Sequence, residues 1–278
     1  MKLLITILLT LGVCHAEPLT GVDLKLVSDT TAIEPAKPFT VGLHIHHHKD
    51  YHTYWQNPGI VGIPTDIEWT LPPGFTAGPI QWPTPEIVDM AGHPAHGFHR
   101  DVLLMIQITP PSKIEARNKT LHAEISWMAC AKTCHPGNTS LSLTLPTGKA
   151  TPSDSRPLFT TAKEKLPTPL TNWSVKLLSP PNAPTIRLLL SSKANPATKL
   201  EHLYFFSSDG QVSSDRPQRL TQKATGKFIL TLERSEYGPE NPSHLPGILS
   251  TATPIARNGD KAARINPAYL DKKQPATP

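Results

Sequence analysis

The chain has 278 residues, and its 27 Lys and Arg residues against 22 Asp and Glu residues give a formal net charge of +5. The basic residues are scattered and form no run of the kind that binds nucleic acid. No Gly-x-Ser-x-Gly, Gly-rich phosphate loop or His-Glu-x-x-His motif is present, so the sequence gives no support for a hydrolytic enzyme.

The first sixteen residues have the pattern of a secretory signal peptide. A basic start at Met1-Lys2 is followed by an apolar run over residues 3–13 and by small residues that end at Ala16. The run is too short to span a bilayer, which takes about 20 apolar residues. We therefore expect cleavage before Glu17 and export of the mature chain.

Short β-type runs follow, separated by turns, because 31 Pro and 16 Gly residues interrupt the chain. In one run Leu121, Ala123, Ile125 and Trp127 alternate with mostly polar residues, which is the period of a half-buried strand. The runs predict an all-β domain over residues 17–148, a β-sandwich. They lie at residues 22–28, 39–47, 67–71, 102–109, 120–128 and 141–145.

A second series of β-type runs lies beyond a segment rich in Pro, Ser, Thr and Lys. Residues 149–171 read as a linker, with a short helix expected near residues 159–166. Residues 172–257 are expected to form a second, smaller β-rich domain, with strands at residues 173–178, 185–191, 201–206 and 227–232. Residues 258–278 are polar and flanked by proline, which favours a disordered tail.

Two cysteines remain once the signal peptide, which contains Cys14, is removed: Cys130 and Cys134. Bridged cysteines need Cα atoms within about 7 Å, whereas four extended residues cover about 13 Å. The chain must therefore curl between them, as a helical turn or a loop at the end of a strand, and Pro136-Gly137 would then turn it toward the next strand. A redox-active pair, a structural disulfide and a metal site all fit this spacing.

Two side chains beside the pair bear on its reactivity. Lys132 and His135 are cationic or can become so, and a nearby cation favours the thiolate that attacks in disulfide exchange. A disulfide that closes so short a loop stabilises a fold less than a long-range one, by about 1 kcal/mol or more. These features favour an exchangeable bridge.

Histidines form a second cluster. On a strand, His44, His46 and His48 would project from one face and His47 from the other. Imidazoles at this spacing are candidate ligands for Cu or Zn, whereas the alternative is a solvated, His-rich strand face. A second group, His93, His96 and His99, is expected in a Gly/Pro-rich loop. No cofactor is required by either group.

Several unusual segments recur in order along the first half of the chain. They are His-Thr-Tyr-Trp-Gln-Asn-Pro-Gly at 52–59, Gly-Ile-Pro-Thr at 62–65, Leu-Pro-Pro-Gly-Phe at 71–75 and Gly-Pro-Ile-Gln-Trp-Pro-Thr-Pro at 78–85. With the Cys130/Cys134 segment, they resemble the N-terminal periplasmic region of the DsbD/ScsB family of protein-disulfide reductases over residues 20–146. The resemblance implies an immunoglobulin-like β-sandwich. Its cysteine pair would take electrons from a membrane-embedded dithiol and pass them to oxidised periplasmic proteins.

Two departures from the family limit what carries over. Full-length members continue into a multi-span membrane domain and a thioredoxin-like domain, which this sequence does not show, so we expect a separate membrane-embedded electron donor of the DsbD/ScsB type. The cysteine spacing is shorter than in the best-known DsbD proteins, so their cap loop and acidic neighbours do not map here. Cys130 and Cys134 alone carry over as redox groups, and Trp127 is expected to shield them.

The sequence thus predicts a periplasmic thiol–disulfide exchange protein, a component of a protein-disulfide reductase. Two alternatives remain: a Cu- or Zn-binding module built on the His-rich strand, and an interaction scaffold whose disulfide is structural.

Overall fold

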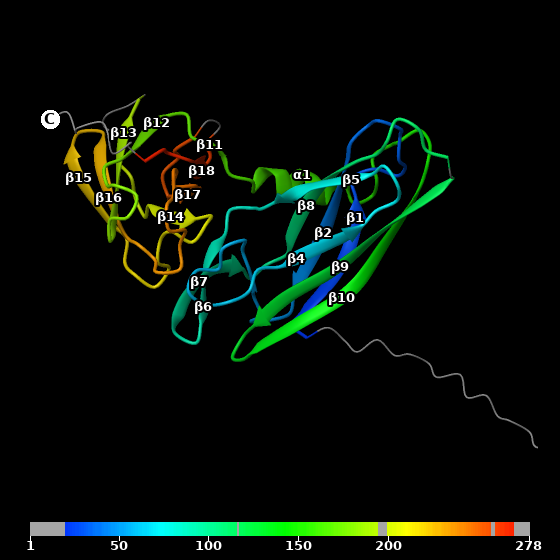
Figure 1. The fold of residues 1–278 in the computed structure, drawn as a ribbon, viewed down its shortest axis with the longest axis horizontal. Coiled ribbons are helices and arrows are strands. Elements are labelled where there is room, and N and C mark those ends of the chain that lie inside the picture. Colours follow the sequence, from blue (N-terminus) through cyan, green and yellow to red (C-terminus); the bar gives the residue numbers. More distant parts are fainter. Residues whose placement is uncertain (1–19, 116, 194–198, 257–258, 270–278) are drawn as a thin grey trace, which may run out of the picture.

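The computed structural model describes residues 20–115, 117–193, 199–256 and 259–269. The predicted signal peptide, residues 1–16, and the end of the predicted tail, residues 270–278, lie outside this range. Within the described residues, no helix is both long and apolar enough to cross a membrane. The strands are arranged in several mostly antiparallel sheets (Figure 1).

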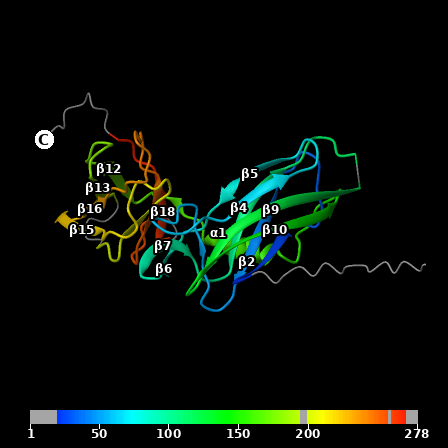
Figure 2. The same ribbon diagram turned by 60° about the horizontal axis from the view of Figure 1, so that its bottom comes forward.

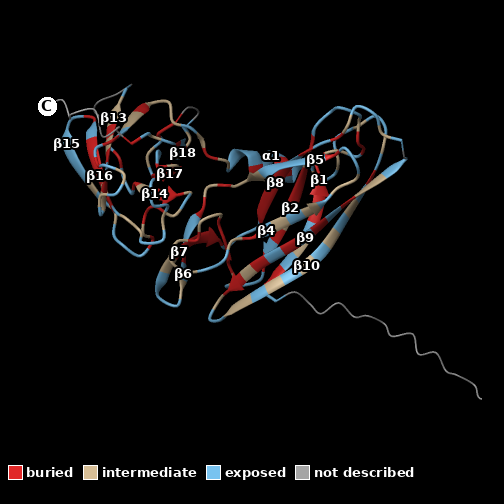
Figure 3. Ribbon diagram, viewed as in Figure 1, coloured by how far each residue is buried: buried red, intermediate tan, exposed pale blue. Residues whose placement is uncertain are grey.

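Two antiparallel sheets build the N-terminal part of the protein. One has the order β1-β2-β8-β5 and the other the order β10-β9-β4. Buried side chains from both sheets, such as Leu43, Leu104 and Ile125, share one hydrophobic core. Figure 3 shows the buried residues concentrated on β2 and β8, whereas β10 is mostly exposed or half-buried. The strands are β1 (Val22–Ser28), β2 (Phe39–His47), β4 (Asp66–Thr70), β5 (Thr76–Gln81), β8 (Val102–Thr109), β9 (Asn118–Cys130) and β10 (Cys134–Pro146).

Strand β10 is longer than the sequence indicates, and Pro136-Gly137 is not the turn expected there. The turn is at residues 131–133, and Pro136 pairs with Met128 inside the β9–β10 ladder. A proline is tolerated because β10 is an edge strand, where an outward-facing N–H is dispensable. Gly137 is required by packing, since a Cβ atom there would lie 2.4 Å from the Trp127 ring.

A third, smaller sheet has the order β3-β7-β6 and stands beside the end of the β9–β10 hairpin (Figure 1). It contains β3 (Thr53–Tyr54), β6 (Glu86–Met90) and β7 (His93–Phe98). The expectation of a loop around His93 and His96 is wrong, because both residues pair with β6. Ala91 and Gly92 make the tight turn between these strands, both with positive φ (53° and 86°).

Helix α1 (Arg156–Glu164) lies in the predicted linker, close to the expected position. Pro157 is accommodated in its first turn, where a missing N–H costs no helical hydrogen bond. Phe159 and Ala162 are buried against Leu103 and Met105 of β8. The helix therefore covers the outer face of the β1-β2-β8-β5 sheet.

The C-terminal part has two further sheets, with the orders β12-β13-β16-β15 and β11-β18-β17-β14. They enclose their own core, which includes Leu188, Phe205 and Leu230. The prediction of a disordered tail from residue 258 is wrong for residues 262–265, which form β18 between β11 and β17. The strands are β11 (Thr168–Pro169), β12 (Trp173–Leu177), β13 (Thr185–Ser192), β14 (Tyr204–Ser207), β15 (Arg219–Ala224), β16 (Lys227–Glu233), β17 (Gly247–Ser250) and β18 (Ala262–Ile265).

Candidate functional site

The two cysteines lie opposite each other at the end of the β9–β10 hairpin. Cys130 is the last residue of β9, Cys134 is the first of β10, and the two are register partners with a Cα–Cα distance of 4.1 Å. They form a disulfide. The loop between them is closed by a hydrogen bond from Ala131 N to Thr133 O (3.0 Å). The curl that the spacing required is thus a tight hairpin loop.

The two sulfur-bearing residues differ in exposure. Cys130 is fully buried, and its backbone N and O both bond to His52, which fixes it from the side of the small sheet. Cys134 is only partly buried and is followed by an edge strand. A sulfur atom of another protein can therefore approach Cys134 more readily than Cys130.

Tyr54 places a hydroxyl group against the bridge. Its Oη donates a hydrogen bond to Cys130 Sγ at 3.0 Å and lies 3.9 Å from Cys134 Sγ. His52 Nε2 lies 3.3 Å from the same oxygen. Because the single phenolic proton points to sulfur, His52 Nε2 must carry the proton that it shares with Tyr54. The result is a chain of donors directed at Cys130 Sγ.

Burial fixes the protonation states of this chain. It raises the pKa of Tyr54 to about 12, so the hydroxyl stays protonated and remains a donor. Burial, with a smaller contribution from nearby His99, lowers the pKa of His52 to about 4. His52 is therefore neutral near pH 7, and the environment of the bridge supplies hydrogen bonds without adding a buried charge.

The β6–β7 hairpin covers the bridge. Its Val88 and Ala95 are fully buried in one cluster with Tyr54 and Cys130, and Met90 packs at the edge of that cluster. The Met90 Sδ atom contacts Cys134 Sγ at 3.1 Å. Thioether sulfur is apolar and adaptable, so it shields the disulfide while remaining easy to displace.

The other residues expected to support the pair lie around the hairpin. Lys132 is exposed in the loop, whereas the His135 Nε2 atom lies 2.9 Å from Thr133 Oγ1 and its ring faces Tyr51. Trp127 is 3 % exposed and belongs to the main core between the sheets. Among the described residues, Tyr54 and Met90 are the side chains with atoms within hydrogen-bond range of the two sulfurs.

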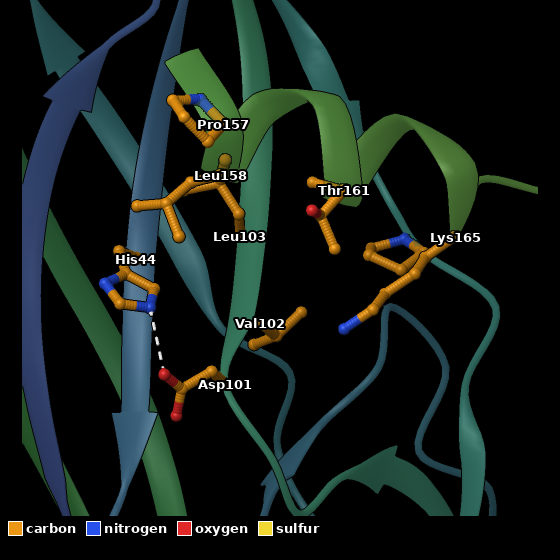
Figure 4. Close-up of a pocket in the computed structure, with 10 residues that line it drawn as sticks. His44, Asp101, Val102, Leu103, Pro157, Leu158, Thr161 and Lys165 are labelled. Carbon is orange, nitrogen blue, oxygen red and sulfur yellow. Dashed lines mark ion pairs between the residues drawn. The ribbon is translucent and has the colours of Figure 1, made fainter. Parts of the chain in front are cut away.

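The His-rich strand lies on β2 and beyond it, with the predicted alternation: His47 is buried, whereas His46 and His48 are exposed and His44 is half-buried. His44 and His46 face Asp101 (3.4 and 2.7 Å), whereas His48 faces Asp23 (3.2 Å). Figure 4 shows His44 and Asp101 at the rim of a cavity between β2, β8 and α1. Across the described ranges, no three His, Cys, Asp or Glu side chains are grouped so as to hold a metal ion.

Tyr54, His52 and Met90 lie beside the bridge although the sequence did not predict them as its neighbours. Tyr54 and His52 sit in a recognised family segment, but they lie 76 and 78 positions before Cys130 in the chain, and only the pairing of β3 with β7 and of His52 with Cys130 brings them there. One sequence signal could have pointed to two of them. His52 and Tyr54 are large side chains two positions apart, so they lie on the same face of a strand.

These features define a class of protein: a mostly β domain that carries a partly accessible disulfide at the end of a hairpin. Residues 24–146 match the family model described as "Thiol:disulfide interchange protein DsbD, N-terminal". Over this part of the chain, the match confirms the resemblance to the DsbD/ScsB family noted in the sequence.

One solved structure shares the fold. The N-terminal periplasmic domain of ScsB from Proteus mirabilis superposes with a TM-score of 0.64 at 16% sequence identity, covering 92% of this chain and 97% of that one. Spo0M, a sporulation control protein from Bacillus subtilis, gives a TM-score of 0.25 at 8% identity, covering 90% and 91% of the two chains. The second score is too low to indicate a shared fold. No curated protein sequence matches the chain.

Proposed function

We propose that this protein is a periplasmic thiol–disulfide exchange protein that relays reducing equivalents from a membrane-embedded dithiol of the DsbD/ScsB type to oxidised periplasmic proteins. Its N-terminal part would be the immunoglobulin-like sandwich of that family. The observation that carries the proposal is the asymmetric bridge, in which Cys134 is partly accessible and Cys130 is buried beneath a hydrogen-bond donor.

The asymmetry assigns a role to each sulfur. A thiolate of the electron donor attacks Cys134 Sγ, the Cys130–Cys134 bond breaks, and its electron pair leaves on Cys130 Sγ as a thiolate. Tyr54 Oη stabilises that thiolate by its hydrogen bond. The donor's second thiolate then displaces Cys134, which leaves the pair reduced and the donor oxidised. The reduced pair passes its electrons to an oxidised partner by the same steps in reverse.

The alternative of an inert, structural bridge has less support. In the chain-entropy model, closing a loop of about five residues stabilises a fold by about 2 kcal/mol, against about 3 kcal/mol for a 15-residue loop. The bridge therefore stabilises the fold by about 1 kcal/mol less than a longer loop closure would.

Capture of a partner tests the function. A chain with Cys130→Ser keeps the accessible Cys134 and lacks the sulfur that would resolve a mixed disulfide. It should therefore retain a disulfide-bonded partner that a reductant releases. A chain that retains none, under conditions where its Cys134 thiol is free, would support the structural bridge instead.

A Tyr54→Phe substitution should raise the pKa of the Cys130 thiol in the reduced protein by about one to two units, because a hydrogen bond to a charged group is worth about 1.5–3 kcal/mol. Reduction of the bridge should slow accordingly, since the leaving thiolate loses its donor. The pH dependence of alkylation of Cys130 measures the pKa. An unchanged pKa would show that the hydroxyl plays no part in exchange.

A further inference from the structure

The β6–β7 hairpin lies between the end of the β9–β10 hairpin and the C-terminal part of the chain, in both views (Figures 1 and 2). One side of it packs on the bridge through Val88, Met90 and Ala95. Its other side meets residues from the C-terminal part, among them Tyr204 and Ser214.

Backbone hydrogen bonds from the N-terminal part reach this hairpin at its base. Across the described residues, the β3–β7 ladder consists of two pairs and ends at Tyr54 and Gly97, and β6 is an edge strand. His96 makes the next backbone bonds, to Trp55 and Pro58. From residue 95 back to residue 86, the hairpin packs on Tyr54 and the bridge, and Pro94 O accepts a hydrogen bond from Ser214 of the C-terminal part.

Ser214 fastens β7 directly. Its side chain is 4 % exposed, accepts a hydrogen bond from Ile60 N (3.1 Å) and donates one to Pro94 O (2.9 Å). The fit is close, because a Cβ atom on Gly59 would lie 2.2 Å from Ser214 Oγ. One buried hydroxyl thus joins two segments of the N-terminal part across the interface.

His96 is held from both sides of the same interface. It is 2 % exposed, and its Nδ1 lies 3.2 Å from Asn57 O, so Nδ1–H donates there. Nε2 is then the acceptor for the Tyr204 hydroxyl at 3.1 Å. Its ring also packs edge-on against Phe206, with centroids 4.9 Å apart. Both nitrogens are satisfied only while the C-terminal part is docked.

We propose that Tyr204 and Ser214 are positioning residues for disulfide exchange: they hold the β6–β7 hairpin closed over Cys130–Cys134. The C-terminal part thereby sets how often the hairpin opens and a foreign sulfur reaches Cys134. This role deepens the proposed exchange function and gives the C-terminal part a task in it, although that part contains no cysteine.

The test compares reduction of the oxidised full-length chain by dithiothreitol in wild type, Tyr204→Phe and Ser214→Ala. Loss of one or two interface hydrogen bonds should make opening easier and raise the reduction rate by about 5- to 30-fold. Amide hydrogen exchange should quicken in β6 and β7 in the same variants, while the amides of β9 keep their protection.

Two variants control for loosening of the C-terminal part in general. Ser213→Ala removes a neighbouring hydroxyl that bonds only locally to Asp215, and Tyr269→Phe removes a buried bond to Gln211 within the C-terminal part. Both should be reduced at the wild-type rate. The proposal is overturned if Tyr204→Phe and Ser214→Ala stay within about twofold of wild type, or if Tyr269→Phe matches them. The reduction rate of each variant relative to wild type tests the positioning role. The reduction rate of the wild type itself tests the exchange function.

Discussion

The Cys134 thiol of a Cys130→Ser variant should react with a small aromatic disulfide at least about tenfold faster than the Cys130 thiol of a Cys134→Ser variant. The expectation rests on access, because Cys134 is partly buried whereas Cys130 is fully enclosed by Tyr54, Val88 and Ala95. Both variants should be without exchange activity, since a single thiol cannot complete the cycle. Release of the aromatic thiolate gives both rates directly.

The two substitutions are matched controls for each other, because each removes the bridge and leaves one cysteine. Their stabilities should be similar, since both lose the same short loop closure. Denaturation of each in urea checks this. Equal rates, or a faster Cys130, would contradict the assignment of Cys134 as the attacked sulfur.

Acid should destabilise this protein well before its carboxylates titrate. Burial lowers the pKa values of His47, His52 and His96 from about 6.5 to about 4. Between these values the unfolded chain binds more protons than the folded one, so the free energy of unfolding falls as the pH falls from about 6.5 to about 4. At about pH 5 the loss is on the order of 2 kcal/mol for each imidazole.

Urea denaturation at about pH 7.5 and about pH 5 measures this loss. A His47→Gln variant should lose less stability on acidification than wild type, because His47 donates to Arg100 O and accepts from Thr53 as a neutral ring. An exposed histidine on β9, His122, is the control, and His122→Gln should keep the full dependence. Equal stability at the two pH values would show that these imidazoles take up protons as readily in the folded protein as in the unfolded chain, which would contradict the lowered pKa values.

Much of the framework of the N-terminal part could be predicted from local pattern. β1, β2 and β8 begin and end where the sequence indicates, because alternating apolar residues and flanking turns define half-buried strands. β6 and β7 could not be predicted in this way. They are short, contain Pro94 and Gly97, and Gly97 is there because a Cβ atom would lie 2.2 Å from Thr53 O. That requirement arises from a tertiary contact.

In the candidate site, too, local pattern predicts one part and tertiary contacts decide the rest. The reach of two cysteines four residues apart predicts their bridge and a loop between them. The identity of the groups around the sulfurs depends on long-range pairing, which placed Tyr54 and Met90 at the bridge and left Trp127 in the core. The electrostatic character also differs from the expectation: neutral hydrogen-bond donors meet the sulfur, whereas Lys132 is exposed in the loop.

The proposed function requires that the Cys130–Cys134 disulfide is reduced and reoxidised by exchange with other thiols. Equilibration of the protein in glutathione buffers of graded redox potential, with the free thiols trapped by alkylation, measures this most directly. We predict a midpoint potential above about −300 mV, since structural disulfides lie below that value. The same midpoint should be reached whether the protein starts oxidised or reduced. A bridge that stays oxidised across the whole range of glutathione buffers would contradict the account.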